Sequence, residues 1–392
     1  MERKGFRVIP VSVHRPFSLA IGQEEISNRT IYLYGTGKIQ FILQGLLGLF
    51  RADYLKALST CLFSDMRDIG FNKLDSWKLL FHFFVAVRLS KILTANRCEH
   101  LHVHFAHVPT QIAMYASAMT GIPFTIMAHA NDIFERGLLL KQKSERAKKF
   151  LTISEYNKNY LISLGLSPDN IDVVRCGVSF PIIENKKQAT DTFTIGTLGR
   201  LVEKKGIDVL IKATNELIIT GYKIKLLIAG DGSLKDELME DVNRLSLQAE
   251  ITFSGSMKHS DVSNWMQSLD TFVLACKMDS NGDQDGIPVV LMEAMSQGVP
   301  VVSTRLSGIP ELVIDGETGL LAEPDDVDSL TAAIEKLIND DSLGKKVAES
   351  AAIHVQDEFG QDVNINRLLE HFNLNHFNNH QGYIGACKDT DE

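Results

Sequence analysis

The chain has 392 residues, enough for about two domains of ordinary size. Apolar residues make up 44% of the chain and charged residues 23%, a balance typical of globular proteins that excludes a wholly disordered chain. The net charge of −9 argues against a nucleic-acid-binding protein, which would ordinarily be basic, but it leaves room for a local basic site.

The cysteines and the apolar segments indicate the compartment. The five cysteines are scattered with no metal-site spacing, which points to a reducing environment. No apolar stretch of signal-peptide length opens the chain, and no run reaches the ~18 residues of a membrane-spanning helix. Segments 41–50 and 79–93 are therefore predicted to be core-facing amphipathic helices, and we expect a cytoplasmic protein.

Short apolar runs alternate with helical patterns along the chain. The first series of predicted strands comprises Phe6–Val13, His100–Phe105, Phe124–Ala128, Phe150–Ile153 and Ile171–Arg175. The second series comprises Thr194–Leu198, Lys225–Ala229, Ile251–Phe253, Thr271–Ala275 and Pro300–Ser303. The predicted helices include Thr110–Thr120, Tyr156–Leu164, Gly206–Ile219, Leu234–Ser246, Pro288–Gln297, Val327–Ile338 and Val363–Phe372. This alternation predicts an α/β fold of parallel sheets with helices on both faces.

The domain boundaries follow from composition. The polar segment 184–192 has no periodic apolar residues and is interpreted as a linker. We expect two doubly wound, Rossmann-like domains, 1–183 and 193–356, that face each other across a cleft. A C-terminal helix within 357–375 is expected to cross back to the first domain. Residues 376–392 are expected to form a mobile tail.

The most informative segment runs from Asp285 to Gly298 and follows a predicted strand and a polar loop. Pro288 suits the first position of a helix, where its missing N–H is not needed. The free amides of Val289 and Val290 would then point out of a positive helix end, which suits a phosphate. Glu293 interrupts an apolar run, and an unpaired buried charge is costly, so we favour a role in binding hydroxyl groups over a purely structural one.

A second segment, Gly199–Gly206, directly follows a predicted strand. Such Gly-rich turns at the carboxyl ends of strands are where open α/β sheets bind ligands. Arg200 can hold a diphosphate with two hydrogen bonds, and Lys205 adds a second positive charge. Both charges would stabilise a leaving diphosphate. Taken alone, the segment could equally be a solvated basic turn.

In this order and at this separation, the two segments resemble the signature of the group 1 (family four) retaining glycosyltransferases, which have the GT-B fold. The run DGIPVVLMEAMSQGVPVVST resembles most the branch that builds bacterial exopolysaccharides of the colanic-acid type. The family pattern is Glu, seven residues, Glu. Here Asp285 replaces the first Glu with a shorter carboxylate, and Glu293 matches the second.

The resemblance implies a role for each matching residue. Arg200 and Lys205 would bind the donor diphosphate, Glu293 the ribose hydroxyls and Asp285 the hydroxyls of the donor sugar. The further donor-binding residues implied are Gly199, Asp231, Gly232, Ser256, Met257, Val289 and Val290. The donor would be a nucleotide-diphosphate sugar, with no cofactor and no metal.

Histidines in the first half suggest two roles. His129, in Met127–Asp132, resembles the family histidine that faces the donor sugar across the cleft. The group His100, His102, His104 and His107 invites a metal hypothesis, but no Asp, Glu or Cys lies among the last three to complete a ligand set. We therefore favour a structural role for this group and expect His104 to pack at the sheet edge.

Two features bear on partners. Segment 141–149 holds five basic residues and one Glu. A solvated helix face is the favoured interpretation, and contact with anionic lipid at the inner membrane face is the second hypothesis, because acceptors in this family are often lipid-linked. The N-terminus resembles the end of the family's first helix followed by its second strand. We therefore expect the first domain to lack its opening strand and to be truncated.

The function expected from the resemblance is metal-independent, retaining transfer of a sugar from a nucleotide-diphosphate sugar to a saccharide or lipid-linked saccharide, with no nucleic acid involved. Two alternatives remain open. One is a nucleotide-sugar epimerase or hydrolase of the same fold. The other is a truncated, non-catalytic protein that binds nucleotide sugars.

Overall fold

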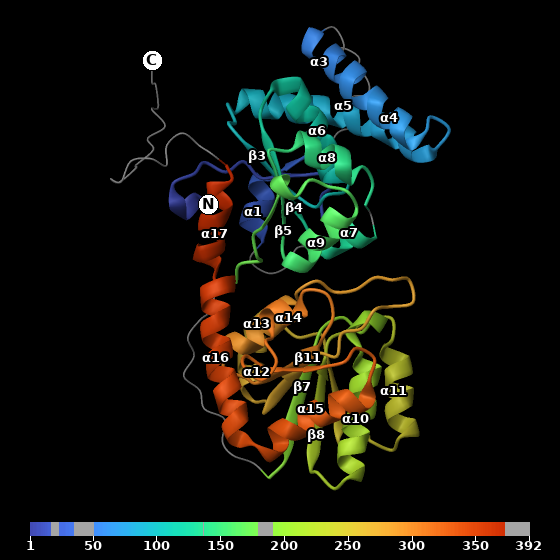
Figure 1. Ribbon diagram of the computed structural model, residues 1–392, viewed down its shortest axis with the longest axis vertical. Helices are drawn as coiled ribbons and strands as arrows, with labels where there is room; N and C mark the ends of the chain where they lie inside the picture. Colours follow the sequence, from blue (N-terminus) through green and yellow to red (C-terminus); the bar gives the residue numbers. More distant parts are fainter. Residues whose placement is uncertain (17–22, 35–50, 136, 179–190, 373–392) are drawn as a thin grey trace.

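The computed structural model describes residues 1–16, 23–34, 51–135, 137–178 and 191–372. They form two lobes built on parallel sheets, and the last helices of the chain run alongside both lobes (Figure 1). The predicted helix 41–50, most of the predicted linker and the predicted mobile tail lie outside the described residues.

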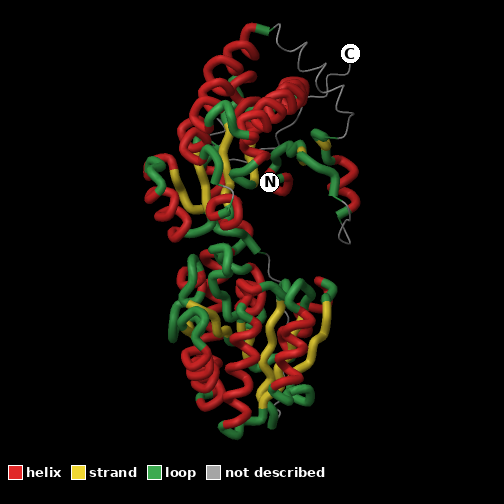
Figure 2. Tube along the Cα trace, turned by 90° about the vertical axis from the view of Figure 1, so that its right-hand side faces the viewer, coloured by secondary structure: helices red, strands yellow, loops and turns green. Residues whose placement is uncertain are grey.

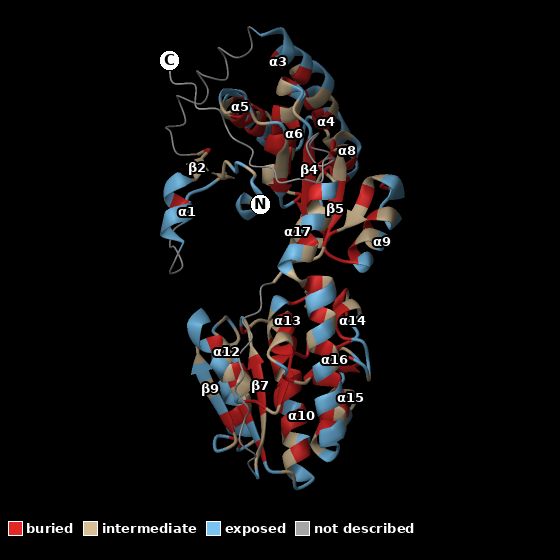
Figure 3. Cartoon of the chain, turned by 90° about the vertical axis from the view of Figure 1, so that its left-hand side faces the viewer, coloured by how far each residue is buried: buried red, intermediate tan, exposed pale blue. Residues whose placement is uncertain are grey.

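The first domain has a four-stranded parallel sheet in the order β3-β4-β5-β6. Its strands are Leu101–His104, Phe124–Ala128, Lys149–Thr152 and Ile171–Val173. Its helices are α1 (Glu24–Arg29), α3 (Ala52–Ala57), α4 (Phe63–Ile69), α5 (Leu74–Ala95), α6 (Val108–Thr120), α7 (Ala130–Phe134), α8 (Leu140–Arg146) and α9 (Glu155–Ser163). Every residue of β4 is buried, as expected for a strand in the middle of a covered parallel sheet (Figure 3).

The N-terminal region differs from the predicted strand Phe6–Val13. Only Val11–Ser12 (β1) is a strand there, and it pairs in parallel with Ile31–Tyr32 (β2) in a separate two-stranded sheet. Within the described residues, no strand precedes Val11 and β3 is an edge of the four-stranded sheet. The predicted strand was too long, because residues 6–10 pair with no other strand among the described residues.

The second domain has a six-stranded parallel sheet in the order β12-β11-β10-β7-β8-β9. Figure 2 shows strands of this lobe running side by side with helices around them. The strands are β7 (Phe193–Leu198), β8 (Ile224–Ala229), β9 (Ile251–Gly255), β10 (Thr271–Val273), β11 (Val301–Thr304) and β12 (Leu320–Ala322). The helices are α10 (Ile207–Ile219), α11 (Lys235–Arg244), α12 (His259–Gln267), α13 (Val289–Ser296), α14 (Ile309–Leu312) and α15 (Val327–Asn339). The two-domain α/β architecture predicted from the alternating pattern is confirmed.

The chain ends with α16 (Asp341–Phe359) and α17 (Gln361–Glu370). The first packs on the second domain through buried residues spaced four apart, among them Val347, Ala351, Val355 and Phe359. The second reaches the first domain, where the Asn364 side chain accepts from the Arg175 amide at 3.0 Å and the Phe372 carbonyl accepts from Lys148 Nζ at 2.8 Å. The last helices therefore join the two domains.

Two histidines form part of this contact. The Phe372 ring stacks on His100 at 4.4 Å between ring centroids and lies 5.3 Å from His102. The buried Thr125 hydroxyl is 3.0 Å from His100 Nε2 and 2.8 Å from His102 Nδ1. Because a hydroxyl has one hydrogen, it can donate to only one of the rings, so at least one imidazole must donate to the Thr125 oxygen through the nitrogen that faces it.

None of the helices in the described part of the chain is both long enough and apolar enough to span a membrane.

The histidine pair predicts acid sensitivity. Burial lowers the pKa of His102 to about 3 and that of His100 to about 4, below the ordinary value near 6.5. The unfolded chain therefore binds more protons as the pH falls from about 6.5 to 4, and the native state loses stability over that window. We expect His102→Asn to remove roughly 1–3 kcal/mol of this pH-dependent loss. The measurement is chemical denaturation at a series of pH values.

The matched control is His14→Asn, at an exposed histidine near β1. It should leave the slope of stability against pH almost unchanged. A wild-type chain whose unfolding free energy is the same at pH 7 and pH 4.5 would contradict the assignment.

Candidate functional site

The predicted donor-binding residues lie at the carboxyl ends of four neighbouring strands. Gly199 and Arg200 follow β7, Asp231 and Gly232 follow β8, Ser256 and Met257 follow β9, and Asp285, Val289, Val290 and Glu293 follow β10. These strands are adjacent in the sheet order β10-β7-β8-β9 and parallel. The topology therefore brings the two sequence segments to one edge of one sheet, where open α/β sheets bind ligands.

The loops after β7 and β8 touch through their backbones. A Cβ on Gly230, which has φ +129°, would lie 1.8 Å from the Gly199 carbonyl oxygen. The next residues are held by a hydrogen bond from the Leu201 amide to the Asp231 carbonyl at 3.0 Å. Only glycine can occupy this position, which explains why a Gly-rich turn follows the strand.

Lys205 bends back over this turn. Its Cε lies 3.5 Å from the position that a Cβ on Gly199 would take. Gly206, with φ +61°, reverses the chain after it, and a Cβ there would lie 1.8 Å from the Ala275 carbonyl oxygen. The turn is thus packed against the end of β10, and this packing brings Lys205 to Asp285.

Asp285 is at the centre of a network of charges. Its carboxylate lies 2.6 Å from Lys205 Nζ and 3.4 Å from Lys204 Nζ, and it accepts from the Cys276 thiol at 3.5 Å. Burial by itself would raise the pKa of Asp285, but the two ammonium groups outweigh that effect and hold the pKa below its usual value. Asp285 is therefore an ionised partner of Lys205.

Lys204 and Asp283 were not singled out from the sequence. Lys204 Nζ donates to Asp283 at 2.7 Å, and burial would lower its pKa, but the carboxylates of Asp283 and Asp285 raise it. Lys204 thereby shares the charge of Asp285 with Lys205. A second lysine beside a glycine turn carries no sequence signal of its own, because such residues are usually solvated.

Helix α13 begins one residue later than predicted. Pro288 is its N-cap and Val289 its first residue. The amides of Val289 and Val290 belong to the first turn, where an α-helix has no internal acceptors. Within that helix, Glu293 is half-buried, and burial raises its pKa although His259 acts in the opposite direction. Helix α12 packs against α13 and begins at His259, two residues after Met257, so the helix that carries Glu293 lies next to the loop that holds Ser256 and Met257.

Arg200 is exposed, and within the described residues no hydrogen bond or ion pair holds its guanidinium. Its backbone follows β7 beside Lys205, so it shares the sheet edge but not the charge network. The two side chains therefore differ: that of Arg200 is solvated, whereas that of Lys205 is bound to a carboxylate.

His129 directly follows β4 in the first domain and is the N-cap of α7. Its ring stacks on His104 with 6.0 Å between centroids and lies 5.1 Å from Phe105. Burial lowers the pKa of His129, so the imidazole is neutral near pH 7. Its amide donates to the Asp132 carboxylate at 2.9 Å, a helix-capping contact that orients the start of α7.

The domains meet where this histidine lies. A Cβ on Gly286, the residue after Asp285, would be 3.4 Å from the Ala130 methyl group and 3.2 Å from Ile153. Ala130 follows His129 directly. The structure therefore places the start of α7, just after β4, against the loop between β10 and α13, with His129 and Asp285 each one residue away from the contact.

Lys143 corrects the view of 141–149 as a fully solvated face. It is completely buried, and its Nζ donates to the carbonyls of Ala106 and Leu138. Burial lowers its pKa to about 7, opposed by the charges of Asp132 and Asp65. Asp132 in turn accepts from the Ala106 amide. Lys143 and Asp132 thus fix the turn after β3 from both sides, next to His104 and His129.

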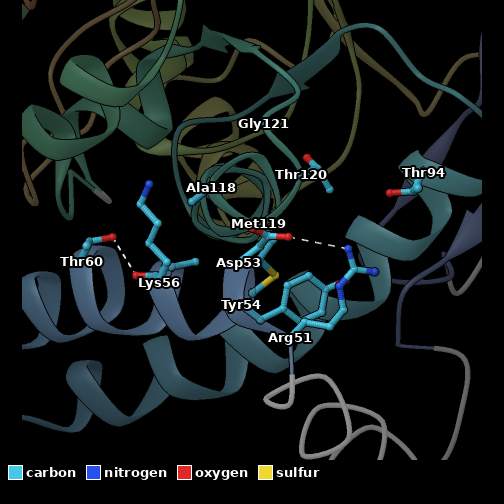
Figure 4. Close-up of a pocket in the computed structure, with 11 residues that line it drawn as sticks. Arg51, Asp53, Tyr54, Lys56, Thr60, Thr94, Ala118, Met119, Thr120 and Gly121 are labelled. Atoms are coloured by element: carbon cyan, nitrogen blue, oxygen red, sulfur yellow. Dashed lines mark hydrogen bonds and ion pairs between the residues drawn. The ribbon is translucent and has the colours of Figure 1, made fainter.

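A separate hollow of about 560 Å³ lies between α3 and the end of α6. Arg51, Lys56, Thr60 and Thr120 line it (Figure 4). It includes Gly121, which leads into the amino end of β4, whereas His129 follows the carboxyl end of the same strand. This hollow is therefore at the opposite end of the sheet from the candidate site.

Comparison with known proteins gives two adjacent family matches. Residues 179–354 match the model for glycosyl transferases group 1, and residues 67–180 match glycosyltransferase family 4. AmsK of Erwinia amylovora, an amylovoran biosynthesis glycosyltransferase, is 31% identical over 250 residues. WcaL of Salmonella typhimurium, whose name assigns it to colanic acid biosynthesis, is 33% identical over 254 residues. Each alignment covers 62% of this chain and 61% of the relative's length.

Solved structures show the same architecture. A glycosyltransferase from Rickettsia africae aligns with a TM-score of 0.64 at 18% identity, over 86% of this chain and 94% of that chain. HepE of Anabaena, in complex with UDP and glucose, aligns with a TM-score of 0.62 at 20% identity, over 73% of this chain and 80% of that chain. The chain therefore contains a glycosyltransferase family 4 domain followed by a glycosyl transferases group 1 domain, and it has the GT-B fold of the solved structures.

Proposed function

We propose that this chain transfers a sugar from a nucleotide-diphosphate sugar to a saccharide or lipid-linked saccharide during polysaccharide synthesis. The observation that carries the proposal is the convergence of Lys205, Asp285 and the first turn of α13 at one sheet edge. A cation and free helix amides together suit a diphosphate. The names of AmsK and WcaL, which refer to amylovoran and colanic acid, support a polysaccharide product.

The donor would lie along the sheet edge. Glu293 would accept hydrogen bonds from the ribose, near Ser256 and Met257. Arg200 and Lys205 would hold the diphosphate, and Asp231 and Gly232 would border it. HepE, which was solved with UDP and glucose, supports a donor of this class.

Asp285 would have two duties. Its contact with Lys205 positions the cation, and its remaining lone pairs can accept from hydroxyls of the donor sugar. Neutral His129, across the domain boundary, can donate to or accept from the same sugar. The shorter Asp at this position reaches Lys205 directly, so the sugar would sit closer to the sheet edge than with a Glu.

The reaction we propose retains configuration at the anomeric carbon. The acceptor oxygen forms a bond to that carbon while the bond from the carbon to the diphosphate oxygen breaks, and the hydroxyl proton passes to the departing diphosphate. No side chain then needs to act as a nucleophile. Arg200, Lys205 and the helix amides would stabilise the negative charge that grows on the departing diphosphate. The proposed reaction therefore needs no metal ion.

A cytoplasmic location is part of the proposal. The four cysteines among the described residues, Cys61, Cys98, Cys176 and Cys276, are free thiols, which suits a reducing compartment. A peripheral contact with the inner membrane face would bring the chain to lipid-linked acceptors. If segment 141–149 takes part, it does so without Lys143, which is buried.

The test of the proposed function is product analysis with a panel of nucleotide sugars, with and without saccharide acceptors. Transfer predicts release of nucleoside diphosphate together with a lengthened acceptor. Release of free sugar regardless of acceptor would favour a hydrolase, and an altered nucleotide sugar would favour an epimerase. Donor binding with no turnover on any acceptor would favour a non-catalytic binding protein.

Removing the diphosphate-binding cations should slow the reaction. We expect Arg200→Ala and Lys205→Ala each to lower kcat by about 10²-fold or more, because each removes charge stabilisation from the leaving group. Lys225→Ala, at an exposed position of β8, is the matched control and should leave kcat unchanged. Steady-state kinetics measure the effect, and wild-type kcat in both variants would defeat the assignment.

Donor affinity should fall in mild acid. Glu293 must be ionised to accept from two ribose hydroxyls, and burial raises its pKa above the ordinary 4.5. Affinity for nucleoside diphosphate should therefore weaken as the pH falls through the raised pKa. Calorimetric titration between pH 7.5 and about 5 measures this change. Glu293→Gln should bind more weakly at pH 7.5, and comparison with wild type separates this carboxyl from the neighbouring His259. An identical pH profile in the variant would contradict the role.

A further inference from the structure

The carboxylate of Glu311, on α14 in the second domain, binds the start of α9 in the first domain and Arg175, which lies in the segment after β6. The carboxylate accepts from the amides of Glu155 at 3.0 Å and Tyr156 at 2.9 Å, the first two residues of α9. It also accepts from Arg175 Nη1 at 2.8 Å. The Glu311 side chain is only 18% exposed and that of Arg175 15%, so water competes weakly for these contacts.

The start of α9 depends on this carboxylate from the other domain. The first turn of a helix has amides without internal acceptors. Ser154 Oγ accepts from the third of them, on Asn157, at 3.1 Å. Glu311 accepts from the other two, and its charge faces the positive end of the helix. When the domains are together, the amides of this turn are thus paired by one residue from each domain.

Arg175 extends the contact to the crossing of the chain between domains. Its guanidinium carbon lies 4.9 Å from the centre of the Phe359 ring, and its Nε is 3.8 Å from the Glu358 carboxylate. Residues 176–178 follow it and pair with the α16–α17 junction through the bridge between Val178 and Gly360. Glu311 therefore links α14 to α9 directly. Through Arg175 it also links α14 to residues 176–178 and to the α16–α17 junction.

The contacts of Glu311 with Glu155, Tyr156 and Arg175, here called the clamp, are surrounded by close packing. A Cβ on Gly308, at the start of α14, would lie 3.0 Å from Ser154 Cβ and 2.8 Å from Ile287 Cγ1. The buried Gln284, next to Asp285, donates to the Tyr156 hydroxyl at 3.2 Å. The same small area thus joins α9 to the loop that carries Asp285 and to the strand end next to His129.

We propose that Glu311 is a positioning residue that sets the separation and angle of the two domains, and thereby the placement of His129 opposite the donor site. It does not touch the reacting atoms. Its effect on turnover rests on the proposed function, because the domain angle alters turnover only if the sugar is held between His129 and Asp285. Its effect on domain arrangement does not depend on that function.

The experiment compares Glu311→Gln in the full chain with wild type by small-angle X-ray scattering, calorimetry and kinetics. The amide keeps the shape but loses the ion pair with Arg175 and one of the two acceptor positions. We expect a larger radius of gyration, a kcat lower by about tenfold and a nucleoside diphosphate Kd within about twofold of wild type. The matched control, Glu317→Gln, changes an exposed Glu near α14 and should behave as wild type.

Two further variants keep the test decisive. Glu311→Asp retains the charge but shortens the side chain, and Gly308→Ala presses directly on Ser154. Both should enlarge the radius of gyration, and either replaces Glu311→Gln if that variant does not fold. Unchanged scattering in Glu311→Gln and Gly308→Ala would overturn the proposal. If the variants change the scattering but the wild-type chain itself has no transferase activity, the role of Glu311 in the domain arrangement is upheld and the proposed function is refuted.

Discussion

The ion pair between Lys205 and Asp285 depends on backbone segments that approach more closely than any side chain would permit. Lys205 reaches the carboxylate because two backbone contacts hold its turn in place. Gly206 turns the chain against the Ala275 carbonyl, and the backbone of Gly199 packs directly on Gly230. The cation thus stands at the carboxyl edge of the sheet with its counter-ion already in place. A diphosphate arriving there would meet a lysine whose position is fixed, so little side-chain entropy is lost on binding.

The site is divided between two domains, and this division explains its other features. The positions that we propose bind the donor follow β7, β8, β9 and β10, whereas His129 follows β4 of the other lobe. Neither lobe can orient a sugar from both sides alone. The contacts of Glu311, Gln284 and Gly286 with the first domain bring the strand ends together, and α16 and α17 run beside both lobes to support that arrangement (Figure 1).

Much of the fold was predictable because local patterns dominate it. Buried parallel strands such as β4 and β8 are short apolar runs, and helices such as α10 carry a clear apolar stripe. Strand β12 was missed because Leu320–Ala322 is only three residues long, and α16 because its buried positions are separated by charged and polar residues. The position of the Gly199 and Asp285 segments at one edge followed from strand order alone.

The sequence could not show which charges meet. Lys143 lies in a run that reads as solvated, yet it is buried beside Asp132, 11 positions earlier in the chain. Asp132 alone had a signal, since an acidic residue three positions after a helix start often caps it. Glu311 and Arg175 are 136 positions apart, and only tertiary structure joins them. Long-range ion pairs leave no trace in local spacing.

The central claim is that a diphosphate binds at the Lys205–Asp285 edge, and an experimental structure of the chain with a bound nucleoside diphosphate tests it most directly. UDP is the first choice, because HepE was solved with it. The account predicts phosphate oxygens within hydrogen-bond distance of Lys205 Nζ and of the Val289 and Val290 amides, with the ribose at Glu293. A nucleotide bound elsewhere, for example at Arg51 and Lys56 beside α3, with Lys205 still paired only to Asp285, would contradict it.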